Sequence, residues 1–153
     1  MSKYTESFTF ASDRAQFTRF YEVAGTFLRR LNIGEDDRFR LLLCISEAFT
    51  NAVVHGNHLE EGKQVRVTFI WDAKTLEIVI EDQGEACPED FDLQQATLAP
   101  GPEAIAGRGI GLIKNYANDL KITAKPEGGL RVRIEWRLDQ ERQIEPTQAE
   151  SPR

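Results

Sequence analysis

Hydrophobic residues recur every three to four positions in two early stretches of the chain, which is the spacing of one face of an α-helix. In residues 13–31 they form a single apolar stripe. This segment is predicted to be an amphipathic helix with Ser12 as its N-cap and Asp13 in its first turn. A second helix is predicted over residues 36–55, ended by Gly56. It is apolar on nearly every side, so it is expected to be largely buried.

Alternation of hydrophobic and polar residues, the pattern of a half-buried strand, marks the predicted sheet. The short link Asp72-Ala73-Lys74 joins two such segments into a hairpin, and Gly128-Gly129 forms the turn of a second hairpin. A weaker alternation near the N-terminus indicates an edge strand, and a short helix is expected at about 110–118. The predicted strands are residues 5–11, 64–71, 76–81, 119–125 and 130–137.

The predicted order of elements is β-α-α-β-β-loop-α-β-β, in which the strands come as hairpins. This order predicts an α+β fold, a two-layer sandwich with a mostly antiparallel mixed sheet and helices on one face. Residues 84–108 lack any usable period, and a loop this long in a compact domain indicates a functional segment. One domain is expected over residues 1–138, followed by a polar, disordered tail at 139–153.

Composition and charge narrow the classes of function. The chain has 153 residues, enough for one domain with a real core. Its net charge of −6 argues against a nucleic-acid partner, because phosphate backbones demand clustered Lys and Arg. No apolar run approaches the roughly 20 residues that span a membrane, and the N-terminus lacks a signal-peptide pattern. A cytoplasmic protein without a membrane partner is therefore expected.

Glu47 and Asn51 stand four residues apart on the most apolar helix, so their side chains share one face. A charge on a buried helix is costly unless it is paired or ligated. The pair can form the polar floor of a pocket, where the Asn51 oxygen suits Mg²⁺ and the Glu47 carboxylate can accept a proton. Alternatively, this face of the helix is exposed and both side chains are merely solvated. The spacing alone does not choose between the two.

Asp82 follows directly after a predicted strand. It could accept a hydrogen bond from an exocyclic amine such as adenine N6, and Gly84 would let a base approach the backbone closely. An ordinary turn is the alternative, because Asp and Gly are both favoured in turns.

The segment Gly107-Arg108-Gly109-Ile110-Gly111-Leu112 precedes and opens the short helix. Its glycines leave backbone N–H groups free to face phosphate oxygens, and the helix N-terminus adds its dipole. Arg108 could add a charge-assisted contact to a terminal phosphate. A flexible hinge is the alternative. The segment is neither a Walker A loop nor a G-x-G-x-x-G motif.

These motifs occur in an order that resembles the GHKL superfamily of gyrase, a chaperone, histidine kinases and MutL. Three segments are most similar to the bacterial anti-sigma factor serine/threonine kinases within that group. They are S-E-A-F-T-N-A-V-V-H-G at 46–56, E-D-Q-G at 81–84 and G-R-G-I-G-L at 107–112. The resemblance covers about residues 5–138.

The resemblance implies the Bergerat fold and a kinase that uses ATP and Mg²⁺. It implies that Glu47 is the general base, that Asn51 binds Mg²⁺ on the phosphates and that Asp82 reads adenine. Residues 85–108 would form the lid over ATP. The expected nucleotide-binding residues are Asn51, Asp82, Gly84, Gly107, Arg108, Gly109, Ile110, Gly111 and Leu112.

The implied substrate is an anti-anti-sigma protein whose Ser or Thr receives the ATP γ-phosphate, and a sigma factor is the other implied partner. A homodimer is expected, as is frequent in the family. The alternative is a non-catalytic anti-sigma or switch module that uses nucleotide only to set partner affinity. The chain departs from the family pattern twice: Ala86 stands where a second glycine often occurs, and Leu130 stands where a Thr often helps to hold adenine.

Overall fold

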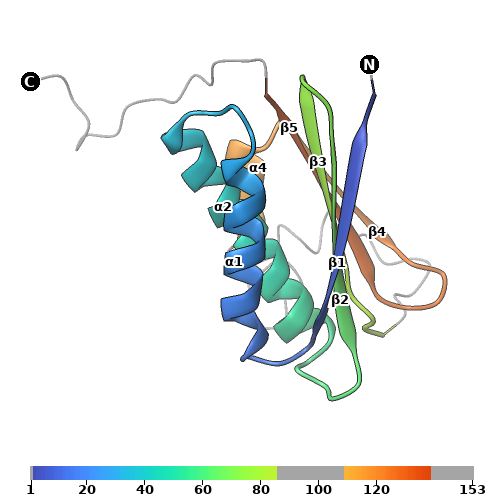
Figure 1. Ribbon diagram of the computed structural model, residues 1–153. Helices are drawn as coiled ribbons and strands as arrows, with labels where there is room; N and C mark the ends of the chain where they lie inside the picture. Colours follow the sequence, from blue (N-terminus) through green and yellow to red (C-terminus); the bar gives the residue numbers. More distant parts are fainter. Residues whose placement is uncertain (1, 86–108, 139–153) are drawn as a thin grey trace, which may run out of the picture.

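The computed structural model describes residues 2–85 and 109–138 (Figure 1). Its elements, in chain order, are β1 Tyr4–Ala11, α1 Gln16–Arg29, α2 Glu35–Thr50, the π-helix η1 Asn51–Gly56, β2 Gln64–Trp71, β3 Thr75–Glu81, α4 Gly109–Tyr116, β4 Asp119–Ala124 and β5 Leu130–Arg137. The predicted order of elements is confirmed. The expected tail at 139–153 lies outside the described residues.

The strands form one sheet in the order β1-β2-β3-β5-β4, and every neighbouring pair is antiparallel. The expectation of a mostly antiparallel sheet is confirmed, and no parallel pair occurs among the described strands. β1 is an edge strand, as predicted. α1, α2 and α4 all lie on one face of the sheet (Figure 1). The result is the two-layer α+β sandwich expected from the hairpin pattern.

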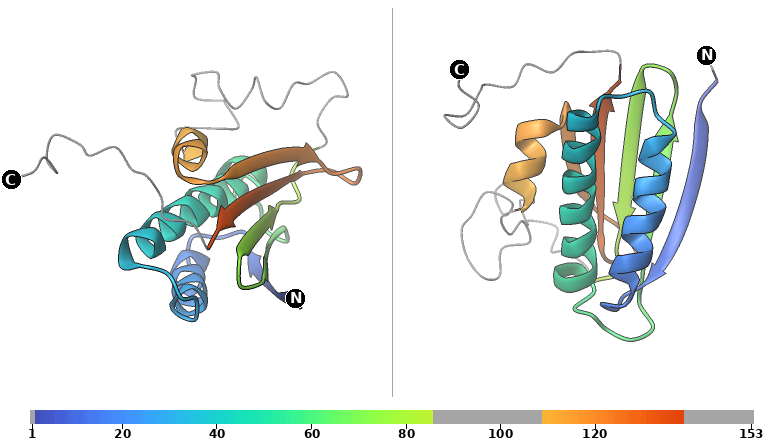
Figure 2. Two further views of the ribbon diagram at one scale, coloured as in Figure 1. Left: turned by 90° about the horizontal axis from the view of Figure 1, so that it is seen from above. Right: turned by 60° about the vertical axis from the view of Figure 1, so that its left-hand side comes forward.

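The alternation in the strands places one side chain in two against the helices. Aromatic rings join the helices to each other and to the sheet: Phe20 of α1 stacks on Phe49 of α2, and Phe27 of α1 stacks on Phe69 of β2, each with ring centroids 4.0 Å apart. α1 and α2 lie side by side over the sheet, and α4 packs beside α2 (Figure 2). This packing sets the position of α2, which carries Glu47 and continues into η1 with Asn51.

α1 begins at Gln16, later than predicted, and Ser12 is not its N-cap. Ser12 is 4% exposed, and its hydroxyl donates to the main-chain oxygen of Val53, 3.2 Å away. The carboxylate of Asp13 instead accepts the Gln16 N–H at 3.2 Å. The local N-cap signal is therefore overridden by a tertiary contact, because the Ser12 hydroxyl is buried against η1.

The predicted helix at 36–55 contains two kinds of helix. Its α-helical part ends at Thr50, and the chain then widens into the π-helix η1 up to Gly56. Such π-helical turns are rare and occur frequently at functional sites. The first turns of α2 are less buried than expected, since Phe39 is 67% exposed. Within the described residues, no helix combines the length and the apolar character needed to cross a membrane.

Candidate functional site

Asp82 lies in a cradle of glycines directly after β3. Its side chain is buried, and its Oδ1 accepts hydrogen bonds from the N–H groups of Gly84 at 2.9 Å and Leu130 at 3.1 Å. A Cβ atom added at Gly56 or Gly129 would collide with Asp82, and one added at Gly84 would collide with the main-chain oxygen of Gly56. The carboxylate can occupy this place only because three segments lack side chains there.

The electrostatics of the cradle leave one acceptor available. Burial raises the pKa of the Asp82 carboxyl, while the N–H groups of Gly84 and Leu130 and the charge of Lys125 act in the opposite direction. Within the described part of the chain, Oδ2 accepts no hydrogen bond and lies beside Gly56. A carboxylate oxygen that accepts no hydrogen bond from the described residues suits a ligand that brings an N–H group. Asp82 is therefore a buried candidate position for such a ligand, and its role in binding stays a prediction.

Because the Asp82 carboxylate is buried, we expect Asp82→Asn to stabilise the protein at neutral pH. The amide oxygen can still accept the two backbone N–H groups, while the cost of burying a charge is removed. Tm should rise by roughly 2–4 °C for each kcal/mol of penalty relieved. The pKa of Asp82 is raised in the folded state. The free-energy cost of its buried charge is therefore present above that pKa and is lost as the pH falls through it. Thermal melts should therefore show the largest gain near pH ~7 and none below about pH 4.

Asp72→Asn is the matched control for this prediction. The N–H groups of Lys74 and Thr75 bond the Asp72 carboxylate at 2.8 and 2.9 Å and lower its pKa. A carboxyl with a lowered pKa contributes stability above its unfolded pKa, so this variant should lower Tm at neutral pH. A fall in Tm for both variants would contradict the burial argument for Asp82.

Asn51 is the first residue of η1 and is half-buried. Its Nδ2 is buried and has no hydrogen-bond partner among the described residues. Its Oδ1 is not among the buried, unpartnered atoms and accepts no hydrogen bond within the same residues, so it is free to take a ligand. An amide oxygen is a suitable ligand for Mg²⁺. The described residues hold no cluster of three His, Cys, Asp or Glu side chains.

Glu47 lies one helical turn before Asn51 on α2. It is half-buried, and it makes no hydrogen bond or ion pair within the described residues. Both Glu47 and Asn51 are partly covered by the fold, so each side chain is neither fully solvated nor fully enclosed. A carboxylate without a partner among the described residues can accept a proton from a hydroxyl.

The glycine-rich motif supplies the start of α4. Gly109 is the first residue of this helix, and Leu112 at its first turn is half-buried. Among the described residues, no atom lies within 4 Å of a Cβ added at Gly111. The first N–H groups of a helix lack intrahelical partners, and the helix dipole favours an anion there. The open space at Gly111 therefore leaves room for a phosphate.

Part of the predicted site lies outside the described residues. Gly107 and Arg108 are in this part, together with residues 86–108 of the expected lid at 85–108. For Ile110 only the backbone is described, in the first turn of α4. The roles assigned to these residues stay predictions.

Several residues of the site were not identified from the sequence. Gly56 was interpreted only as the end of a helix, and Gly129 only as part of a turn, yet both border the Asp82 carboxylate. Lys125 donates from Nζ to the main-chain oxygen of Asp82 at 2.8 Å, and its side chain is 9% exposed. No local pattern marks these positions in the sequence. Asn57, directly after Gly56, is a polar residue, and polar residues are seldom fully buried, but its burial is visible only in the structure.

Comparisons with known proteins point to one family. A family model described as a histidine kinase-like ATPase domain matches residues 10–136. An anti-sigma F factor of Shouchella clausii is 25% identical over 138 residues, which are 90% of this chain and 93% of the relative. An anti-sigma F factor of Heyndrickxia coagulans is 29% identical over 133 residues, covering 86% of this chain and 89% of the relative.

A solved structure shares the fold. The blue-light activated histidine kinase of Erythrobacter litoralis EL346 superposes with a TM-score of 0.55 at 21% sequence identity, covering 82% of this chain and 42% of that chain. The match of the family model includes Glu47, Asn51 and Asp82, and it confirms both the resemblance drawn from the motifs and the expected use of a nucleotide. The chain belongs to the family of histidine kinase-like ATPase domains.

Proposed function

We propose that the chain is an ATP-dependent serine/threonine protein kinase that regulates a sigma factor by partner switching. The observation that carries this proposal is the half-buried carboxylate of Glu47, which has no partner among the described residues and lies one turn before Asn51. A domain that only binds nucleotide has no need of a base at this position. The relatives named anti-sigma F factors support the choice of a sigma factor as the regulated protein.

Adenine would be read by Asp82. Its Oδ2, which accepts no hydrogen bond from the described residues, would accept one from the N6 amine. The absence of a side chain at Gly84 would let the base approach the backbone. Asp82→Asn would place an amide N–H₂ group opposite the N6 amine, because the amide oxygen is kept by Gly84 and Leu130. The resulting clash of two donors should weaken ATP binding by about 5- to 150-fold, the equivalent of roughly 1–3 kcal/mol.

The phosphates would lie between Asn51 and the start of α4. The Asn51 oxygen would hold Mg²⁺, which on the phosphates neutralises the charge that develops during transfer. The backbone N–H groups of Gly109 and Gly111 would face phosphate oxygens, with Gly107 and Arg108 completing the contact. Glu47 would accept the proton of the attacking Ser or Thr hydroxyl.

The protein substrate would be of the anti-anti-sigma type, and its Ser or Thr hydroxyl would receive the γ-phosphate. The same chain would bind the sigma factor when that substrate is phosphorylated and released. A homodimer is part of this proposal and can be checked by light scattering. Neither nucleic acid nor a membrane takes part in the proposed exchange.

Two measurements test the function. Titration calorimetry with ATP and Mg²⁺ should give a Kd in the micromolar range, about −8 kcal/mol. Incubation with γ-labelled ATP and the purified anti-anti-sigma proteins of the source organism should label a Ser or Thr on one of them. ATP binding without label on any of them would contradict the kinase and favour a nucleotide-dependent binding module. The absence of ATP binding would contradict both.

A further inference from the structure

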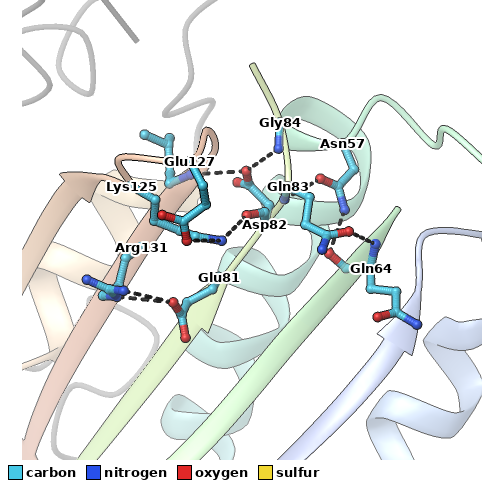
Figure 3. A network of polar contacts seen from close by, with 10 residues as sticks. Asn57, Gln64, Glu81, Asp82, Gln83, Gly84, Lys125, Glu127 and Arg131 are labelled. Atoms are coloured by element: carbon cyan, nitrogen blue, oxygen red, sulfur yellow. Dashed lines mark hydrogen bonds and ion pairs between the residues drawn. The ribbon is translucent and has the colours of Figure 1, made fainter. Parts of the chain in front are cut away.

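We propose that Asn57 and Lys125 are positioning residues that set the nucleobase specificity of the site. They bind opposite ends of one peptide group, the one between Asp82 and Gln83, and we call the pair the peptide clamp. The inference rests on the proposed function of Asp82 in reading adenine. Figure 3 shows the two side chains approaching this peptide group from different elements.

Asn57 binds the N–H side of this peptide group. It is fully buried, and its Oδ1 accepts the Gln83 N–H at 2.7 Å. Its Nδ2 donates to the main-chain oxygen of Gln64 at 3.0 Å, so both ends of the amide are used. The next two residues, His58 and Leu59, have φ angles of 54° and 56°, a conformation that non-glycine residues rarely adopt. The backbone is therefore in a rarely adopted conformation directly after Asn57, whose buried side-chain amide uses both its oxygen and its nitrogen in hydrogen bonds.

Lys125 binds the carbonyl side of the same peptide group. Its Nζ lies 2.8 Å from the main-chain oxygen of Asp82, and it comes from the turn between β4 and β5. The side chain is 9% exposed, and its only ion pair among the described residues is with the exposed Glu127 at 3.7 Å. A long cationic side chain is thus largely covered while its charge is directed at a backbone carbonyl.

The clamp holds the main-chain path from Asp82 to Gly84, whose N–H group bonds the Asp82 Oδ1 and so orients the carboxylate. Rotation of the Asp82–Gln83 peptide plane changes ψ of Asp82 and φ of Gln83 together. With its oxygen held by Lys125 and its N–H held by Asn57, the plane cannot rotate without breaking a hydrogen bond. A hydrogen bond to a base requires a defined direction as well as distance. Loss of either contact should therefore weaken discrimination between bases more than it weakens binding of the phosphates.

The ratio of ATP to inosine triphosphate affinity reports this role. Inosine triphosphate carries a carbonyl oxygen where ATP has the N6 amine, so an ionised Asp82 would repel it. Calorimetry on the wild type should give a ratio of at least about 10, because sites built around one hydrogen bond reject analogues that lack it. Asn57→Leu and Lys125→Met should each lower the ratio by roughly threefold or more. In an Asp82→Ala background, neither change should lower it further, because all act through one side chain.

Two control variants separate positioning from general stability. Asn118 Oδ1 accepts the Arg137 N–H at 2.8 Å, also holding a strand backbone, and Lys121 is an exposed lysine on β4. Asn118→Ala and Lys121→Met should leave the ratio unchanged, whatever they do to Tm.

The outcomes distinguish the clamp from the proposed function. If the wild type binds no ATP, the adenine role of Asp82 and the clamp both fall. If the wild type prefers ATP to inosine triphosphate and both clamp variants keep this affinity ratio while only their Tm falls, the clamp alone is refuted. Should Asn57→Leu fail to fold, Lys125→Met decides, because it removes only the ammonium from a side chain of similar length. An unchanged ratio in that variant overturns the proposal.

Discussion

Replacing Glu47 by Gln is expected to slow phosphate transfer by about 10²–10⁴-fold while leaving ATP affinity unchanged. The amide keeps the size of the side chain and cannot accept the proton of the attacking hydroxyl. Glu47 has no hydrogen-bond partner among the described residues, so the change should not disturb packing. Single-turnover transfer from γ-labelled ATP to the substrate protein measures the chemical step, and calorimetry measures binding.

Glu61→Gln is the control for this variant. Glu61 is exposed in the loop between η1 and β2, and its replacement removes the same charge from the molecule. It should leave transfer within about twofold of the wild type, since exposed charges interact weakly. Full transfer activity in Glu47→Gln would show that another group, or none, takes the proton.

Replacing Asn51 by Leu is expected to change ligand binding and stability in opposite directions. Outer-shell partners of metal ligands typically contribute 10–100-fold to affinity, so loss of a direct ligand should weaken ATP binding with Mg²⁺ by at least about 10-fold. The buried Nδ2 has no partner among the described residues, and an unsatisfied buried donor costs about 1–3 kcal/mol. The unliganded variant should therefore melt at a higher temperature than the wild type.

The Mg²⁺ arm of the same titration is the internal control. With EDTA in place of Mg²⁺, wild type and Asn51→Leu should bind ATP with similar affinity, because adenine recognition at Asp82 is intact. A variant that loses ATP binding equally with and without Mg²⁺ would contradict the assignment of Asn51 as a metal ligand. A variant that melts lower would contradict the cost assigned to its unpaired amide.

The sequence by itself determined the elements and their order. Apolar residues at helical spacing predict the amphipathic helix α1, and alternation predicts each strand, because burial against one layer imposes one period on a helix and another on a strand. It also indicated Glu47 and Asn51 as candidates, because their spacing is a local property of the helix. Three short motifs in order were enough to indicate the family, which the comparison confirmed.

Only the tertiary structure decided the surroundings of these residues. Asp82 followed by glycine is typical of any turn, and its burial depends on Gly56 and Gly129, which come from distant parts of the chain. Ser12 has the sequence of an N-cap, yet its hydroxyl bonds Val53 across the fold. Contacts of this kind arise when separate elements pack, and no local pattern records which backbone group will meet a given side chain. The elements and chemical candidates were therefore readable from the sequence, whereas the cradle and the peptide clamp required the packed fold.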